Sequence, residues 1–275
     1  MHSTTSAPGH RVCSAAFFDL DNTLIGGSSL FHLGWGGFKR GMFSSRQMFR
    51  FTVEQLFFRL TRKEWASATE TWGNFGAAYV KGAEVAALAR FGREVIAESI
   101  APALRGPVLA MARRHLSAGE EVWIVTASPH EVSQMLAESL GFTGGIGTRA
   151  EVRDGRYTGR LPAGVLHGPR KAQAVVDLAG ERGIDLARSS AYSDSINDLP
   201  LLLAVGFPQA VAPDRQLARL ARQRGWPVHQ SRSYKGLLGL ANRPRSQDGV
   251  GLTPGGIAPG TRPPLPAPET ENPRV

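Results

Sequence analysis

The ten residues from Ala15 to Leu24 constrain the fold of this chain more than any other stretch. They begin as a short apolar run and end in two aspartates, Asp19 and Asp21, followed at once by a polar turn. Apolar residues flanked by chain breakers are typical of a buried, parallel strand. Because ligands of open α/β sheets bind beyond the carboxyl ends of such strands, the aspartates lie where chemistry is expected. Two carboxylates this close repel each other unless a cation or a shared proton compensates them.

The composition is that of an ordinary globular protein with a basic surplus. Of the 275 residues, 42% are hydrophobic and 20% are charged, and the formal net charge is +9. This surplus favours anionic partners in general, and we expect no nucleic-acid partner. Cys13 is the only cysteine, which excludes an intrachain disulfide and predicts a reducing compartment. Because we find neither a signal peptide nor a run of roughly 20 apolar residues, we predict a cytoplasmic protein without a transmembrane segment.

The order of predicted elements divides the chain into four parts. Residues 1–12 are polar and residues 242–275 are rich in Gly and Pro, so both ends are expected to be disordered. Residues 30–101 show apolar positions at helical spacing without strand-like alternation, which predicts an inserted helical cap. Residues 13–29 and 102–241 alternate strands with helices. They predict an α/β core with a Rossmann-like, doubly wound parallel sheet.

Several elements of this core can be placed from turn and cap signals. A helix is expected to begin with Ser128 as N-cap and Pro129 at its first position. Asp154 and Gly155 predict the turn of a β-hairpin. The remaining expected elements are helices from Pro107 to Ser117 and from Pro169 to Arg182, and strands at Glu121 to Thr126, Ser189 to Ser193 and Gln209 to Val211.

Further polar residues lie where the later strands end or where a helix begins. Thr126 ends the second strand just before a helix N-terminus, whose amides favour an anion. Lys171 lies four residues before Val175 on the inner stripe of its helix. Asp194 and Asp198 follow the strand that ends at Ser193. Each residue alone is more often a cap or a surface charge, but in this order they predict one site.

With these motifs the chain resembles the haloacid dehalogenase superfamily of phosphotransferases, in its phosphoserine-phosphatase-like branch. The resemblance covers about residues 13–230 and rests on Phe18 to Thr23, Val125 to Ser128, Lys171 and Ser193 to Asp198. It implies a Mg²⁺-dependent phosphomonoester hydrolase that acts on a small phosphorylated metabolite.

The resemblance also implies a role for each site residue. Asp19 is the nucleophile that forms an aspartyl-phosphate, and Asp21 is the general acid and then the general base. Mg²⁺ is held by Asp19, the backbone carbonyl of Asp21 and Asp194. The phosphate-binding set is Thr126, Ala127 and Lys171, and the supporting set is Thr23, Asn197 and Asp198, the last orienting either the waters of the metal or Lys171.

One position departs from phosphoserine phosphatases. Those enzymes carry a glutamate shortly after the first motif that pairs with the substrate amino group, and the corresponding residue here is Ser28. Ser28 is therefore expected to influence specificity, with phosphoserine hydrolysed no better than an amine-free phosphomonoester. The presence of Asp21, the implied general acid and base, argues against a dehalogenase that displaces halide. Phosphoryl transfer to another acceptor, as in a mutase, and a regulatory protein of growth or development that binds a phosphorylated ligand stay open as alternatives, as does the oligomeric state.

Overall fold

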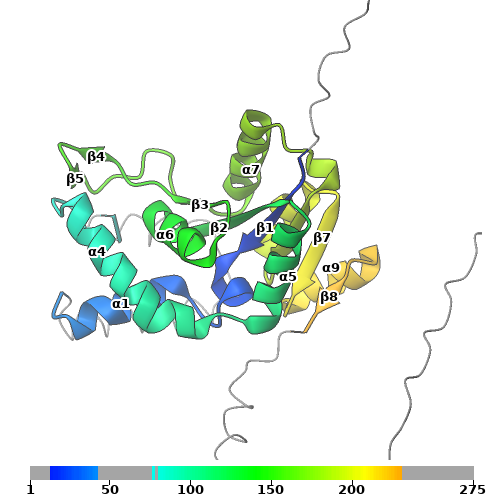
Figure 1. Cartoon of the computed structure of the whole chain (residues 1–275), viewed down its shortest axis with the longest axis horizontal. Coiled ribbons are helices and arrows are strands. Elements are labelled where there is room, and N and C mark those ends of the chain that lie inside the picture. The colour runs from blue at the N-terminus through cyan, green and yellow to red at the C-terminus, as the bar shows by residue number, and fades with distance from the viewer. Residues whose placement is uncertain (1–12, 43–75, 78–79, 231–275) are drawn as a thin grey trace, which may run out of the picture. The chain divides into compact units, whose positions relative to one another are not determined.

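The computed structural model describes residues 13–42, 76–77 and 80–230. The predicted disordered ends and the stretch 43–75 of the predicted cap lie outside these residues. Within the described ranges, six strands form one sheet in the order β3-β2-β1-β6-β7-β8, and all neighbouring strands are parallel (Figure 1). The α/β fold class predicted from the sequence is confirmed.

The strands of this sheet are short and the helices between them are of moderate length. The sheet strands are β1 Ala15–Asp19, β2 Glu121–Pro129, β3 Gly144–Thr148, β6 Ser190–Ser193, β7 Phe207–Val211 and β8 Val228–His229. A separate hairpin consists of β4 Val152–Arg153 and β5 Arg156–Tyr157. The described α-helices are α1 Ser29–Lys39, α4 Val85–Val95, α5 Gly106–Ser117, α6 His130–Leu140, α7 Pro169–Arg182, α8 Leu199–Leu203 and α9 Arg215–Arg224. Single turns of other helix types are η1 Leu20–Leu24, η2 Ile96–Ile100, η3 Ala101–Ala103, η4 Leu186–Arg188 and η5 Ile196–Asp198.

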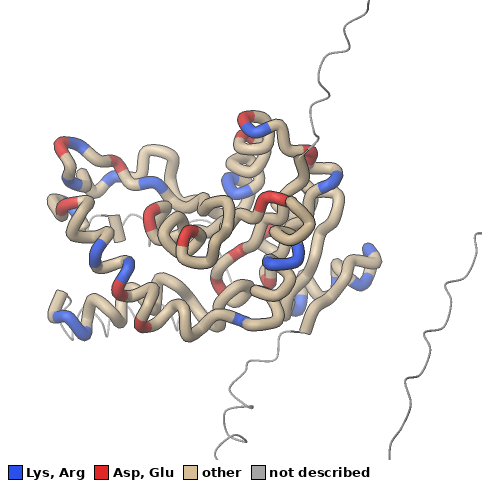
Figure 2. The backbone as a smooth tube through the Cα atoms, in the orientation of Figure 1, with Lys and Arg blue, Asp and Glu red and all other residues tan. Residues whose placement is uncertain are grey.

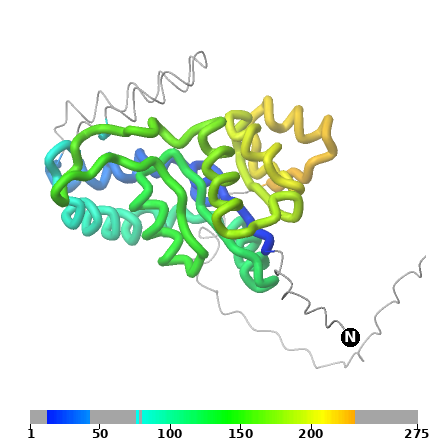
Figure 3. The backbone as a smooth tube through the Cα atoms, turned by 90° about the horizontal axis from the view of Figure 1, so that it is seen from above, coloured from blue at the N-terminus to red at the C-terminus, as the bar shows by residue number. Residues whose placement is uncertain are grey.

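Strand β1 is buried along its whole length because both faces of the sheet are covered. Phe18 packs in a cluster with residues of α5 and α6, and Phe17 packs in a second cluster with residues of α7, α8 and α9. The strand therefore appears in the sequence as a continuous apolar run instead of an alternation. In both views of the backbone, α4 and α9 lie at opposite ends of this unit (Figures 1 and 3).

The strand order reverses at β1, which has β2 on one side and β6 on the other. Asp19 pairs with Val125 of β2, and Phe18 pairs with Tyr192 of β6. The carboxyl ends of these three strands consequently lie together. In open α/β sheets such a switch point is where ligands bind.

The described residues of the predicted cap contain α1, α4 and η2. The hairpin β4–β5 is hydrogen-bonded to the chain at the start of α4. Backbone amides of Gly82 and Val85 donate to the carbonyls of Tyr157 and Gly155. Basic and acidic residues are interspersed along these elements (Figure 2), and exposed ion pairs such as Arg156–Glu84, at 2.6 Å, neutralise the charge locally. No helix in the described ranges is long and apolar enough to cross a membrane.

The predicted start of the helix after β2 is wrong. Ser128 and Pro129 belong to β2, and the N-cap of α6 is Pro129, with no capping hydrogen bond from a side chain. The strand continues because Pro129 pairs with Thr148 after a register shift, and the Thr148 hydroxyl donates to the carbonyl of Ala127 at 2.6 Å. The hydroxyl of Ser128 is therefore not used as a helix cap.

Strand β3, with the sequence Gly144-Gly145-Ile146-Gly147-Thr148, was not predicted, because glycine is depleted in strands. Its glycines are required by close approach to neighbouring groups. A Cβ at Gly144 would lie 2.5 Å from the ring of Trp123, and one at Gly145 would lie 2.3 Å from the backbone carbon of Ser133 in α6. The missing side chains let α6 pack directly on this edge of the sheet.

Replacing Gly145 with alanine should therefore destabilise the protein by about 2 kcal/mol or more, because the added methyl group meets rigid backbone. The matched control is Gly180→Ala in α7, where a Cβ meets nothing within 4 Å. This control should stabilise the fold by up to about 1 kcal/mol, since alanine is the better helix former. Urea denaturation measures both changes. Equal stability of the two variants would contradict the packing described for β3.

Candidate active site

The carboxylate of Asp19, at the end of β1, forms an ion pair with Lys171 inside the protein. The Lys171 Nζ donates to Asp19 Oδ1 at 2.5 Å and to Asp198 Oδ2 at 2.9 Å. None of the three side chains is more than 7% exposed. Lys171 reaches inward because it shares the buried face of α7 with Val175, as the helical spacing predicted. The Ser193 hydroxyl donates to Asp198 Oδ2 at 2.8 Å, which fixes the second carboxylate.

Burial and charge act in opposite directions on these groups. Burial alone would lower the pKa of Lys171, but Asp19 and Asp198 outweigh it and raise the pKa above its ordinary value. Burial raises the pKa of Asp19 well above its ordinary value, Lys171 opposes this, and repulsion from Asp198, Asp194 and Asp21 adds to it. Lys171 therefore stays charged, and the cluster holds more carboxyl groups than this single cation compensates.

Asp21 lies in the turn η1, two residues beyond the nucleophile predicted at Asp19. The turn is possible because Asn22 adopts a positive φ of 57°, which Asn tolerates better than most residues. The Asn22 amide donates to the Gly27 carbonyl at 3.0 Å, and the Gly27 amide donates to Asn22 Oδ1 at 3.2 Å. These bonds close the loop and return the chain to the start of α1 beside Asp21.

The carboxylate of Asp21 is held by the first residues of α1. Its Oδ1 accepts hydrogen bonds from the Ser29 amide at 2.8 Å and the Ser29 hydroxyl at 2.5 Å. Its Oδ2 accepts a longer bond, 3.3 Å, from the Ser28 hydroxyl. Burial raises the pKa of Asp21, and the bonds from Ser29 partly oppose that rise. Ser28, expected to influence specificity, thus contacts the predicted general acid.

Asp194 follows β6 and is fixed by Thr23. The Thr23 hydroxyl accepts from the Asp194 amide at 3.0 Å and donates to Asp194 Oδ1 at 3.3 Å. Burial, followed by repulsion from Asp198, raises the pKa of Asp194 to about 7. Within the described part of the chain, the buried Asp198 Oδ1 has no hydrogen-bond partner. Asp198 is thus paired with Lys171 through Oδ2 only, and its Oδ1 lies in the same cluster as the Asp194 carboxylate.

Thr126 and Ala127 lie next to Asp19 because β1 and β2 are paired in parallel. Thr126 is buried and follows Val125, the register partner of Asp19. The Thr126 hydroxyl accepts from the Ser128 amide at 3.2 Å. The N-terminus of α6 comes later in the chain than predicted, so strand residues separate it from Thr126.

Asn197, predicted as a supporting residue of the site, bonds its own turn instead of one of the site carboxylates. Its side-chain amide donates to the Ser195 hydroxyl at 3.1 Å, which supports the turn η5. The sequence prediction missed Ser29, whose hydroxyl contacts Asp21, and His167, whose pKa is lowered by burial and by the charge of Lys171. In the sequence, the run from Gly26 to Ser29 indicates only the start of a helix and gives no sign that Ser29 contacts Asp21.

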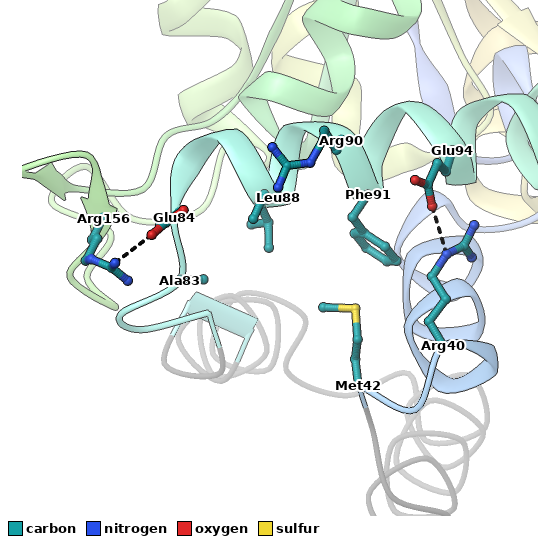
Figure 4. A pocket seen from close by; sticks show the side chains of 10 residues that line it. Arg40, Met42, Ala83, Glu84, Leu88, Arg90, Phe91, Glu94 and Arg156 are labelled. Atoms are coloured by element: carbon teal, nitrogen blue, oxygen red, sulfur yellow. Dashed lines mark hydrogen bonds and ion pairs between the residues drawn. The ribbon is translucent and has the colours of Figure 1, made fainter.

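A groove of about 470 Å³ lies among α1, α4 and the hairpin, apart from these residues. Met42, Leu88 and Phe91 point into it between α1, α4 and the hairpin (Figure 4). None of the predicted site residues lines it, so the groove is not the centre described above.

The order of the motifs matches a known family. The family model of haloacid dehalogenase-like hydrolases matches residues 16–203. The chain belongs to this family. A phosphoserine phosphatase of Mycobacterium tuberculosis is 42% identical over 225 residues, covering 82% of this chain and 73% of the relative. A histidinol-phosphatase of Neisseria meningitidis is 32% identical, covering 78% of this chain and 96% of that enzyme.

A solved structure shows a similar fold. A protein of unknown function from Bordetella pertussis has a TM-score of 0.69 and 30% sequence identity, covering 79% of this chain and 98% of that chain. This haloacid dehalogenase-like hydrolase is thus a phosphatase of the phosphoserine-phosphatase-like branch. The family, the fold and the enzyme class predicted from the sequence are confirmed.

Proposed function

We propose that this phosphatase hydrolyses a small phosphomonoester in two steps, through a phosphorylated Asp19 and with the help of Mg²⁺. The observation that carries the proposal is the buried ion pair between Asp19 and Lys171, beside a second carboxylate with separate donors. A structural salt bridge would not need the further carboxyl groups of Asp21, Asp194 and Asp198 around it. A site for a phosphoryl group and a divalent cation does need them.

In the first step, an Asp19 oxygen attacks phosphorus while the bond from phosphorus to the ester oxygen breaks. Asp21 gives its proton to the departing oxygen, which leaves as an alcohol. In the second step, Asp21 takes a proton from water, the water oxygen bonds to phosphorus, and the bond to Asp19 breaks. The products are inorganic phosphate and free Asp19. The raised pKa of Asp21 suits the first role, because it favours the protonated form.

Lys171 and the end of β2 are assigned to the phosphoryl oxygens. Lys171 stays positively charged beside Asp19, so it can neutralise charge on the group being transferred. The Thr126 hydroxyl and the backbone amide of Ala127 are the proposed donors from the neighbouring strand. Asp198 holds Lys171 in place through the contact of 2.9 Å and is proposed as a positioning residue.

The residues at this edge fit Mg²⁺. Asp19, Asp194 and the Asp21 backbone carbonyl would hold it, and all three offer the oxygen ligands that Mg²⁺ prefers. Among the described residues, no group of three His, Cys, Asp or Glu side chains that could hold a metal occurs. The proposed ligand set is two carboxylates and one carbonyl, and Mg²⁺ usually keeps several waters besides such ligands. The excess of carboxyl groups over cations and the orphaned Asp198 Oδ1 favour an added positive charge. When bound, Mg²⁺ supplies charge neutralisation for phosphoryl transfer.

Turnover should therefore depend on Mg²⁺ and on Asp194. Hydrolysis of glycerol phosphate, phosphoserine and histidinol phosphate is measured as phosphate release with Mg²⁺ and with EDTA. We expect turnover with Mg²⁺ only, and a loss of about 100-fold or more in Asp194→Asn, in keeping with the cost of removing charge stabilisation. Glycerol phosphate should be at least as good a substrate as phosphoserine, because Ser28 offers no carboxylate to an amine. Equal rates with EDTA would contradict the metal site.

A thermal melt gives a readout that does not depend on turnover. The pKa of Asp194 is raised in the fold, so its ionisation costs stability as pH rises from its ordinary value of 3.8 to about 7. Mg²⁺ binds the ionised carboxylates and should raise the melting temperature more at about pH 8 than at about pH 6. The Asp194→Asn protein should show a much smaller shift at both values. No shift in the parent protein would count against a bound cation.

A further inference from the structure

We propose that Ser29 is a positioning residue for Asp21, and that Ser128 orients Ser29, so that a chain of hydroxyl groups selects which oxygen of the general acid transfers its proton. This inference rests on the proposed role of Asp21. It concerns residues from two distant parts of the chain, the first residue of α1 and the end of β2.

The contacts of Ser29 converge on one oxygen atom. Its amide and its hydroxyl both donate to Asp21 Oδ1, at 2.8 and 2.5 Å. Ser29 is 0% exposed and Ser128 is 1% exposed, so water does not compete with these bonds. Ser29 is the first residue of α1, whose N-cap is Ser28. Its hydroxyl therefore holds Asp21 instead of capping the helix.

The direction of the chain follows from counting protons. A serine hydroxyl has one hydrogen to donate. Ser29 uses its hydrogen on Asp21 Oδ1, so the close contact between the two serine hydroxyls must be donated by Ser128. The backbone amide of Ser128 in turn donates to the Thr126 hydroxyl at 3.2 Å. The chain thus runs from the proposed phosphate-binding strand through the start of the cap to the general acid.

This arrangement distinguishes the two oxygens of Asp21. Oδ1 accepts two short hydrogen bonds, whereas Oδ2 accepts only the 3.3 Å bond from Ser28. A carboxyl proton is least favourable on an oxygen that already accepts from two donors, so it resides on Oδ2. Without the Ser29 hydroxyl, only the Ser29 amide would still hold Oδ1. The carboxyl group could then rotate more freely, and the leaving oxygen would meet the wrong atom in part of the molecules.

The test uses leaving groups that differ in their need for a proton. An alkyl phosphate such as glycerol phosphate needs protonation of its leaving oxygen, whereas 4-nitrophenyl phosphate leaves as a stable anion. Ser29→Ala should lower kcat/KM for glycerol phosphate by about 10- to 100-fold, part of the usual value of acid catalysis. For 4-nitrophenyl phosphate the loss should be less than about threefold. Ser128→Ala should show the same selectivity with a smaller loss.

Ser189→Ala is the matched control, because it also removes a fully buried hydroxyl. Ser189 bonds the Asp185 carbonyl and the Ala15 amide at the other end of the sheet. This control should lower the melting temperature without changing the ratio of the kcat/KM values for the two substrates. Equal losses on both substrates in Ser29→Ala, or no loss on either, would overturn the proposal.

A double-mutant comparison separates this inference from the proposed function. If Ser29 acts through Asp21, then Ser29→Ala should cause no further loss in kcat/KM when Asp21 is already asparagine. If the losses in kcat/KM from the two substitutions are fully additive, the positioning role is overturned. This criterion applies even if the single variants fold poorly. If Asp21→Asn itself shows no selectivity for the alkyl phosphate, the role of Asp21 has failed instead, and Ser29 loses its proposed function with it.

Discussion

Asp19→Asn is expected to reduce turnover by about 10⁴-fold or more, because it replaces the carboxylate that is proposed to attack phosphorus. The variant hardly changes the volume of the side chain and keeps an oxygen for Lys171. Rapid quenching of the parent protein during turnover, followed by peptide mass spectrometry, should find phosphate on Asp19. The variant should show none.

The same variant should not lose stability in the absence of metal. Burial and the neighbouring carboxylates raise the pKa of Asp19, so its ionised form is costly in the fold, and asparagine removes this cost. Asp177→Asn on the exposed face of α7 is the matched control and should keep full activity. Phosphate trapped on any other residue, or strong residual turnover, would refute the nucleophile.

Lys171→Met is expected to impair both activity and stability. Activity should fall by about 10³-fold, because the buried cation that is proposed to neutralise the phosphoryl group is lost. Stability should fall by about 3–5 kcal/mol, because Asp19 and Asp198 stay buried without their partner. Phosphate release and urea denaturation measure the two effects, and Lys81→Met at an exposed position is the control.

A second substitution tests the reason for the instability. Adding Asp198→Asn to Lys171→Met removes one of the two stranded carboxylates, so part of the lost stability should return. Activity should not return, because the cation is still missing. If the double variant is less stable than Lys171→Met alone, then packing around the lysine stem, and not unpaired charge, determines the effect.

Periodicity and strand order explain which parts of the site were predictable. Lys171 could be assigned to the interior because it shares a helical face with Val175, and Thr126 could be placed beside Asp19 because parallel strands end at the same edge. The turn at Asp154 and Gly155 is likewise a local signal, and both residues adopt the positive φ it predicts.

The features that were missed depend on contacts between distant segments. Ser29 and Ser128 are small polar residues with no periodic pattern, and their role exists only because α1 starts beside the end of β2. Strand β3 was missed because Gly145 is selected by the backbone of α6 and not by strand propensity. Rules that use only neighbouring residues in the sequence cannot predict the contact of α1 with β2 or of α6 with β3.

The central position of β1 has a consequence for the order of events during synthesis. The strand that carries Asp19 is made before the other described strands of its sheet, yet the amide of Ala15 donates to the Ser189 hydroxyl, 174 residues away. Neither β2 nor β6 exists when β1 leaves the ribosome, and chains rich in such long-range pairings fold slowly. We therefore expect Asp19, the proposed nucleophile, to lack an ordered position in a nascent chain that ends before β6. Phosphatase activity should then appear only after most of the sheet has been translated.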